Sequence, residues 1–313
     1  MGQPHDTMVF PIFQSGIPMA EQKHGVITGA SSGIGAALTR ALAADGWALY
    51  VCARRADKLD QVTEGNSLAF GYPCDVSREN QVKEFVAQVR GRTSHVDALI
   101  NCAGGFGSIG PILQTDSGDW FRTIEVGLYG TYLMTKHIIP LMKRERGPRI
   151  INFSGGGAFG PFPNYSAYAV CKAGVVRLTE NLAVELAAAG IRVNAIAPGF
   201  VATPIHDATL QVGSEMAGGE HFRRTQQLLQ EGAVPMEVPV ACVRFLLSDR
   251  AGQLTGKTIS ASFDPWNTAD FVARIPQINQ SDLYTLRRIN LVNLPDKEMC
   301  GALSQPPREE DGR

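Results

Sequence analysis

The sequence lacks the features that mark disulfide-rich, metal-binding or nucleic-acid-binding proteins. Its six cysteines include no C-x-x-C pair, and several lie in apolar runs, so we expect reduced thiols and no metal site. Lys and Arg total 29 against 30 Asp and Glu, which leaves no overall charge to hold nucleic acid or an anionic membrane. The expected partner is therefore a small molecule that is recognised locally.

The sequence also has no apolar run long enough to cross a membrane, which takes about 20 residues. The apolar stretch from Met8 to Met19 is interrupted by Pro11 and Pro18, and no basic segment precedes it as in a signal peptide. These absences predict a cytoplasmic protein.

The sequence is rich in glycine, with 33 residues. It also has short apolar runs that alternate with segments of helical period. Strands are expected around 25–28, 48–53, 67–72, 96–101, 149–153, 192–196 and 258–263. Helices are expected at 34–45, 56–62, 78–90, 116–143 and 167–189. This order predicts an α/β fold: a Rossmann-type doubly wound parallel sheet of about seven strands with helices on both faces. Ligands bind such sheets at the carboxyl ends of the strands.

The first predicted strand runs into a glycine-rich turn that opens a helix, Thr28-Gly29-Ala30-Ser31-Ser32-Gly33-Ile34-Gly35. Gly29 allows a sharp turn, Gly33 lets the backbone approach a pyrophosphate, and Gly35 permits close packing of the helix on the strand. The free amides of the helix N-terminus bind phosphate. Because a strand precedes the turn and a helix follows it, we interpret it as a dinucleotide site, the alternative being a turn whose glycines serve packing only.

The end of the second predicted strand favours NADP over NAD. An NAD site usually has an acidic residue there, about 20 positions after the glycines, to bind the ribose 2′-hydroxyl. Here the strand ends in Cys52-Ala53-Arg54-Arg55, and an arginine suits a 2′-phosphate. Arg54 is the better candidate because it lies closer to the strand end. The alternative is a solvated arginine pair at the start of the next helix.

Tyr168 and Lys172 lie at positions i and i+4 of one predicted helix, so their side chains share a face. An ammonium about 4 Å from a phenolate, at an effective dielectric constant of about 20, stabilises it by about 4 kcal/mol. That is enough to lower a tyrosine pKa from about 10 towards about 7. Tyr168 is then expected to exchange a proton with a carbonyl or alcohol oxygen, while Lys172 reaches the cofactor ribose. A Tyr-x-x-x-Lys pair alone is common, and most are surface contacts.

The order of the motifs makes residues 23–263 similar to the short-chain dehydrogenase/reductase family. The motifs are the glycine-rich turn, Asp75-Val76, Asn101-Cys102-Ala103-Gly104, the Tyr168 to Lys172 segment and Pro198-Gly199-Phe200-Val201-Ala202-Thr203. The resemblance implies that Tyr168 is the proton donor and Lys172 its electrostatic partner. It places Asp75 and Val76 beside the adenine, and Val201 and Thr203 at the nicotinamide carboxamide. With Arg54, the expected cofactor-binding residues are Gly29, Ser31, Ser32, Gly33, Ile34, Gly35, Arg54, Asp75, Val76, Asn101, Ala103, Gly104, Tyr168, Lys172, Pro198, Gly199, Val201 and Thr203.

Two positions depart from the family pattern. Gly155 stands thirteen residues before Tyr168, where the family usually has a serine that holds the substrate oxygen. Ser154 is one residue away, and we take it as the third catalytic candidate because the glycines that follow allow the backbone to turn it inward. Ser166, Asn164 or a backbone amide of the glycine run are the alternatives.

The second departure is Gly127, where the family has an asparagine in its long central helix. This glycine puts the usual water-mediated proton relay in doubt. The expected function is still an NADP-dependent oxidoreductase that interconverts a carbonyl and a secondary alcohol by hydride transfer. The alternatives are altered chemistry, such as epimerisation through a transient ketone or double-bond reduction, and a non-catalytic dinucleotide-binding regulator.

The chain divides into three expected segments. Residues 1–22 form an N-terminal extension, 23–263 the NAD(P)-binding catalytic domain, and 264–313 a C-terminal extension whose last ten or so residues are polar and expected to be disordered. The middle of that extension is expected to cover the pocket or to reach a neighbouring subunit. The family resemblance implies a homodimer or homotetramer formed through the helices at 116–143 and 167–189.

Overall fold

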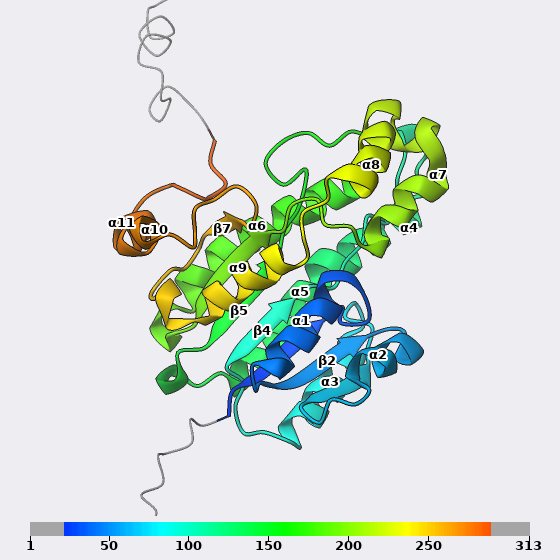
Figure 1. The fold of residues 1–313 in the computed structure, drawn as a ribbon. Helices are drawn as coiled ribbons and strands as arrows, with labels where there is room; N and C mark the ends of the chain where they lie inside the picture. The colour runs from blue at the N-terminus through cyan, green and yellow to red at the C-terminus, as the bar shows by residue number, and fades with distance from the viewer. Residues whose placement is uncertain (1–21, 289–313) are drawn as a thin grey trace, which may run out of the picture.

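A seven-stranded parallel sheet forms the centre of the protein, in the order β3-β2-β1-β4-β5-β6-β7 (Figure 1). This is a computed structural model, and it describes residues 22–288. The strands are β1 (His24–Thr28), β2 (Ala48–Ala53), β3 (Ala69–Pro73), β4 (Ala98–Asn101), β5 (Arg149–Phe153), β6 (Arg192–Ala197) and β7 (Thr258–Ser260). The order reverses between β1 and β4, which is where doubly wound sheets bind their ligands. The predicted fold class is confirmed.

Helices cover both faces of the sheet because alternate side chains of each strand point to opposite faces. On one face, Ile27, Val51 and Ile151 join a core with α1 (Gly33–Ala44), α2 (Ala56–Thr63) and α9 (Glu237–Leu247). On the other face, Val26 and Leu99 pack with α3 (Glu79–Arg90), α5 (Gly130–Ile138) and α6 (Ser166–Glu185). Two further helices, α7 (Asp207–Ala217) and α8 (Gly219–Glu231), follow β6 and form a separate unit, seen at the upper right of Figure 1.

The long helix predicted at 116–143 is not one regular helix. It consists of α4 (Ser117–Ile124), a π-helical turn η2 (Glu125–Tyr129) and α5, and it ends in a 3-10 turn (Ile139–Leu141) that contains Pro140. Proline has no backbone N–H and ends the α-helical hydrogen bonding there. The π turn contains Gly127, and such turns are frequent at functional sites.

The segment after β7 packs on its own chain. It includes α10 (Ala269–Ala273) and α11 (Ile275–Asn279), and its Trp266 and Phe271 rings lie 5.5 and 6.2 Å from that of Phe245 in α9. The carbonyl of Tyr284 accepts a hydrogen bond from the amide of Thr258 in β7. Residues 264–288 therefore cover the β7 edge and α9. The predicted N-terminal extension up to residue 21 and the predicted disordered end lie outside the described residues.

Candidate active site

The glycine-rich turn joins β1 to α1 at the carboxyl ends of the strands. Gly29 and Gly33 have positive φ values of +68° and +53°, which favour glycine. A Cβ on Gly29 would lie 2.7 Å from the Cα of Ala103, so the turn and the segment after β4 are in close contact. The Thr28 hydroxyl fastens them together by accepting hydrogen bonds from the amides of Cys102 and Ala103, at 3.1 and 3.0 Å. The backbone is therefore shaped for a close-lying dinucleotide phosphate.

The two arginines after β2 have different partners. The Arg55 guanidinium donates to the hydroxyls of Ser31 and Ser32 in the turn, at 3.3 and 3.2 Å. Arg54 instead interacts electrostatically with Asp75; although burial opposes the effect, hydrogen bonds from Ser77 and the Arg54 charge lower the pKa of Asp75. The sequence favours Arg54, whereas Arg55 is the arginine that contacts the glycine-rich turn. Arg55 is the N-cap of α2, in agreement with the predicted start of that helix, but the spacing did not show that its side chain reaches back to the turn.

Asn101 at the end of β4 and Gly104 just after it have different surroundings. The Asn101 amide donates to Asn152 and Thr135 at 2.9 and 3.2 Å, so this side chain holds β4, β5 and α5 together. Gly104 lies toward the helix α6, since a Cβ on it would be 3.5 Å from the Lys172 ammonium. The backbone at 103–104 thus passes between the glycine-rich turn and Lys172.

Tyr168 and Lys172 are buried together on α6, with exposed fractions of 7% and 6%. The Lys172 nitrogen lies 5.6 Å from the centre of the Tyr168 ring and donates a 2.7 Å hydrogen bond to the carbonyl of Phe153 at the end of β5. Burial raises the pKa of Tyr168 above its usual range. This differs from the expected lowering, because desolvation dominates and Lys172 donates to a carbonyl instead of to the phenol.

Gly155 leaves room for the Tyr168 hydroxyl. A Cβ on Gly155 would overlap with that hydroxyl, so the phenol occupies the space of the serine side chain that the family usually has there. The Ser154 amide donates to the carbonyl of Ile196 at 2.9 Å, which shows that strand pairing continues to this residue. Its hydroxyl is buried and has no hydrogen-bond partner among residues 22–288. Of the alternatives, the Ser166 hydroxyl accepts a hydrogen bond from the Trp120 indole at 3.0 Å.

Gly127 lies against Cys171, a residue that the sequence did not single out for the site. A Cβ on Gly127 would overlap with the sulfur of Cys171, which is buried on α6 between Tyr168 and Lys172. The thiol therefore fills the space beside the π turn where the family has an asparagine side chain. Cys171 lies within the Tyr-x-x-x-Lys segment, so the sequence placed it near the site. Spacing alone does not show that its side chain faces Gly127.

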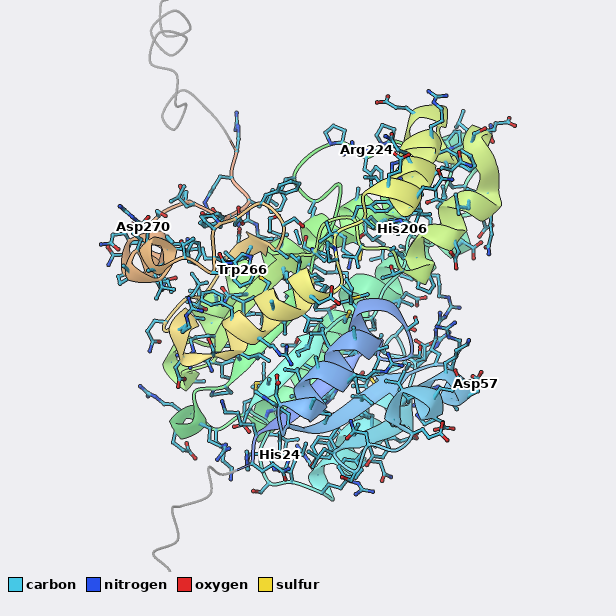
Figure 2. All side chains as sticks on the ribbon, viewed as in Figure 1. His24, Asp57, His206, Arg224, Trp266 and Asp270 are labelled. Carbon is cyan, nitrogen blue, oxygen red and sulfur yellow. The ribbon has the colours of Figure 1, made fainter. Side chains whose placement is uncertain are left out.

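An aromatic cluster covers Tyr168. The Phe106 ring lies edge-on to it at 4.9 Å and the Phe162 ring at 6.3 Å. Phe106 also contacts His206, 5.7 Å away, at the start of the α7–α8 unit. Figure 2 shows His206 below α8, near the point where this unit leaves the sheet. The Tyr168 side chain is thus packed against aromatic rings.

Residues 22–288 contain no metal-binding cluster and no disulfide bond. No group of His, Cys, Asp and Glu side chains in that range is placed to hold a metal ion. The cysteines in the same range, Cys52, Cys74, Cys102, Cys171 and Cys242, are free thiols. No helix within it is long and apolar enough to cross a membrane.

Comparison with known proteins identifies relatives over most of the chain. A family profile described as Enoyl-(Acyl carrier protein) reductase matches residues 29–262. The chain is 32% identical over 243 residues to the pig protein "Dehydrogenase/reductase SDR family member 4", across 76% of this chain and 85% of the relative. It is 34% identical over 247 residues to the "Uncharacterized oxidoreductase YxbG" of Bacillus subtilis, across 77% and 90% of the two chains.

Solved structures agree with these relatives. A crystal structure of an actinorhodin polyketide ketoreductase variant with NADPH superposes with a TM-score of 0.70 at 30% identity, covering 79% of this chain and 98% of that one. Levodione reductase gives a TM-score of 0.68 at 30% identity, covering 76% and 95%. The glycines of the turn and the buried tyrosine–lysine pair lie within the matched residues 29–262. The chain therefore belongs to the short-chain dehydrogenase/reductase family of NAD(P)-dependent oxidoreductases.

Proposed function

We propose that this protein uses NADP to interconvert a carbonyl group and a secondary alcohol, with Tyr168 as the proton donor or acceptor. The observation that carries the proposal is the burial of Tyr168 and Lys172 side by side at the carboxyl end of β5, next to the glycine-rich turn. When bound, the nicotinamide supplies the hydride. The protein supplies the proton, the position of the substrate oxygen and a site shielded from water.

The chain's residues fit such a dinucleotide. The turn at 29–35 offers amides at the N-terminus of α1 to the pyrophosphate, and the nearby backbone at 103–104 leads to Lys172, which we assign to the ribose. Asp75 and Val76 are proposed at the adenine, and Val201 and Thr203 at the carboxamide. For the 2′-phosphate we propose Arg55 together with Arg54, Ser31 and Ser32. The Arg55 contacts with both serines support this preference for NADP.

The proton chemistry follows from the state of Tyr168. Its raised pKa keeps the phenol neutral near pH 7, which is the form that donates a proton to a carbonyl oxygen as the carbon receives hydride. Ser154 remains a proposed third catalytic residue; Ser154→Ala tests it, and an unchanged turnover rate would exclude it. A purely regulatory dinucleotide binder gives no reason to bury a tyrosine beside Lys172, which argues for catalysis.

Tyr168→Phe tests the proposed function, assayed with a panel of ketones, keto sugars and alcohols. Turnover is expected to fall by at least about 100-fold, the usual scale of general acid catalysis, with NADPH affinity preserved. Tyr165→Phe is the matched control, because Tyr165 is buried on the same segment but its hydroxyl pairs with Thr209 at 2.9 Å. Near-normal turnover in Tyr168→Phe would remove this residue from the mechanism.

We also propose that the protein forms a homodimer or homotetramer through α4, η2, α5 and α6. Large apolar side chains on these elements are exposed: Phe121, Tyr129, Tyr132, Val170 and Val184. Exposed aromatic groups on neighbouring helices are typical of protein interfaces. Light scattering of the wild type and of Phe121→Glu tests the assignment, and a monomeric wild type would contradict it. The cytoplasmic location remains a prediction.

A further inference from the structure

A surface pocket lies between α1 and α2, next to the glycine-rich turn. It has a volume of about 470 Å³ and extends from Ser32 to Arg40, about two helical turns along α1. A second pocket of about 430 Å³ continues it toward Leu68, and the two share Arg40, Gln61 and Val62. Together they form an open groove of the size that binds small molecules.

The pocket next to the turn carries positive charge that the protein does not neutralise. Arg40 and Lys58 line it and are exposed to solvent, and no acidic residue of the described chain is part of its lining. Neither of these two side chains makes a hydrogen bond or an ion pair within residues 22–288. Two unpaired cations in one pocket attract an anion, and they attract an anion with several charges most strongly.

The hydroxyls of Ser31 and Ser32 add hydrogen-bond donors at the end of the pocket next to the turn. Each accepts a hydrogen bond from the Arg55 guanidinium, at 3.3 and 3.2 Å, so the proton of each hydroxyl is left for another acceptor. Ser32 is the N-cap of α1, yet its side chain makes no capping hydrogen bond. The pocket therefore offers cations and donors together, which suits a phosphate group with its several acceptor oxygens.

The pocket touches the proposed cofactor site and extends beyond it. Residues 31–33 and Thr203 line the pocket and are also assigned to the dinucleotide. Arg40 and Lys58 have no place in that assignment, since Arg40 lies about two turns further along α1 and Lys58 lies on α2. A ligand held by these two side chains would share a wall with the cofactor without taking its place.

We propose that this pocket binds a small ligand with a diphosphate group, in addition to the dinucleotide. Arg40 and Lys58 bind the charged oxygens of this ligand, and the hydroxyls of Ser31 and Ser32 donate hydrogen bonds to it. The 2′-phosphate of NADP is assigned to the other side of the same serines, so each anion weakens the binding of the other. This coupling rests on the proposed function, whereas binding of the diphosphate does not.

Calorimetric titration of inorganic pyrophosphate into the NADH-saturated protein tests the binding. NADH fills the dinucleotide phosphate site and has no 2′-phosphate, so the titration reports on the remaining pocket. One pyrophosphate is expected to bind per chain, and its affinity is expected to fall as salt is added.

Three variants locate the bound pyrophosphate. Arg40→Gln and Lys58→Gln are each expected to raise its Kd by about three- to tenfold, because each removes one charge from a solvent-exposed pocket. Arg90→Gln is the matched control, since Arg90 is an exposed arginine in the last turn of α3 and its loss changes the net charge equally. The Kd in this control is expected to stay within about twofold of the wild type.

The coupling is measured by titrating NADPH and NADH with and without pyrophosphate. Pyrophosphate is expected to raise the Kd of NADPH by about threefold or more and that of NADH by less than about twofold, because only NADPH has the 2′-phosphate. Potassium chloride at the same ionic strength controls for screening. Arg40→Gln and Lys58→Gln are expected to reduce the pyrophosphate effect and to leave the affinity for NADPH alone within about twofold of the wild type.

Several results would overturn the inference. Pyrophosphate that binds the free protein but not the NADH-saturated one occupies the dinucleotide phosphate site instead. Equal losses of pyrophosphate affinity in Arg40→Gln, Lys58→Gln and Arg90→Gln would show only a general effect of charge. Arg40→Gln or Lys58→Gln that weakens NADPH but not NADH, with no pyrophosphate present, would assign the pocket to the 2′-phosphate.

Failure of the proposed function gives a different result. A protein that binds neither NADH nor NADPH contradicts that function. Pyrophosphate binding by the free protein, weakened in Arg40→Gln and Lys58→Gln but not in Arg90→Gln, would in that case still support the diphosphate pocket. No pyrophosphate binding under either condition would overturn the inference and leave the proposed function intact.

Discussion

The hydroxyl of Tyr168 lies over Gly155, in the space that a side chain at residue 155 would occupy. The usual serine and this tyrosine position are therefore mutually exclusive in the present conformation. In the proposed reaction, a group other than the side chain of residue 155 has to hold the substrate oxygen. The lack of a side chain at Gly155 also allows the Tyr168 phenol to be buried in its present position. Restoring the family residue is for this reason not expected to improve the enzyme.

Gly155→Ser tests that coupling. The new side chain is expected to displace the phenol and to lower the free energy of unfolding by about 1–3 kcal/mol, as overpacking does. Ketone reduction is expected to slow in parallel. Thermal unfolding and kcat measure the two effects, with Gly156→Ser as the control, since a Cβ on Gly156 meets only Phe162, at 3.9 Å. An activated, equally stable Gly155→Ser would refute the coupling.

Gly127 and Cys171 are expected to behave as a second coupled pair. Alanine is favoured over glycine by about 1 kcal/mol in a helix, yet Gly127→Ala places a methyl group against the Cys171 sulfur. We therefore expect Gly127→Ala to destabilise the wild type and to be neutral or stabilising in a Cys171→Ala background. A double-mutant cycle in urea measures the coupling, and additive effects would show that the two residues are independent.

The pH dependence of the reaction distinguishes an acidic tyrosine from a buried neutral one. Because burial raises the pKa of Tyr168, the protonated form persists to higher pH than in free tyrosine. Reduction uses that form, so its initial rate is expected to vary little between about pH 6 and about pH 9. Alcohol oxidation uses the phenolate and is expected to rise throughout this range. A plateau of the oxidation rate near about pH 7 would instead support acidification by Lys172.

Arg55→Ala and Arg54→Ala separate the two candidates for the 2′-phosphate. Arg55 contacts Ser31 and Ser32, so its loss is expected to weaken NADPH binding by about 10- to 100-fold, the worth of hydrogen bonds to a charged group. NADH binding is expected to change by less than about threefold. Titrations of both cofactors with both variants provide the measurement. Equal losses for NADPH and NADH would rule out a 2′-phosphate contact.

The sequence predicted the sheet well because short apolar runs between helical segments define a parallel sheet with little ambiguity. The start and end of β5 and of β2 agree with the predicted ranges, and β7 is only three residues long because Ser262 and Phe263 leave the sheet. The π turn at Gly127 was not predictable, since helical periodicity continues through it. The turn lies against Cys171 from another helix, a contact that only the tertiary structure shows.

The motifs of the site could be predicted from the sequence, but the contacts between their side chains could not. Spacing placed Tyr168 and Lys172 on one face of a helix, and they are together in the structure. Spacing carried no information about burial, and burial reverses the expected direction of the Tyr168 pKa shift. His206 belongs to no motif, and the unpaired state of its buried Nδ1 among residues 22–288 cannot be seen in a sequence.

The segment 264–288 pairs with the outer edge of β7. The outward amide of Thr258 pairs with the Tyr284 carbonyl at 2.8 Å, and that of Ser260 pairs with the Asp264 carboxylate at 2.6 Å. An edge strand whose amides are already paired does not template a strand from another molecule. A continuous sheet across two subunits at β7 would require this segment to detach first.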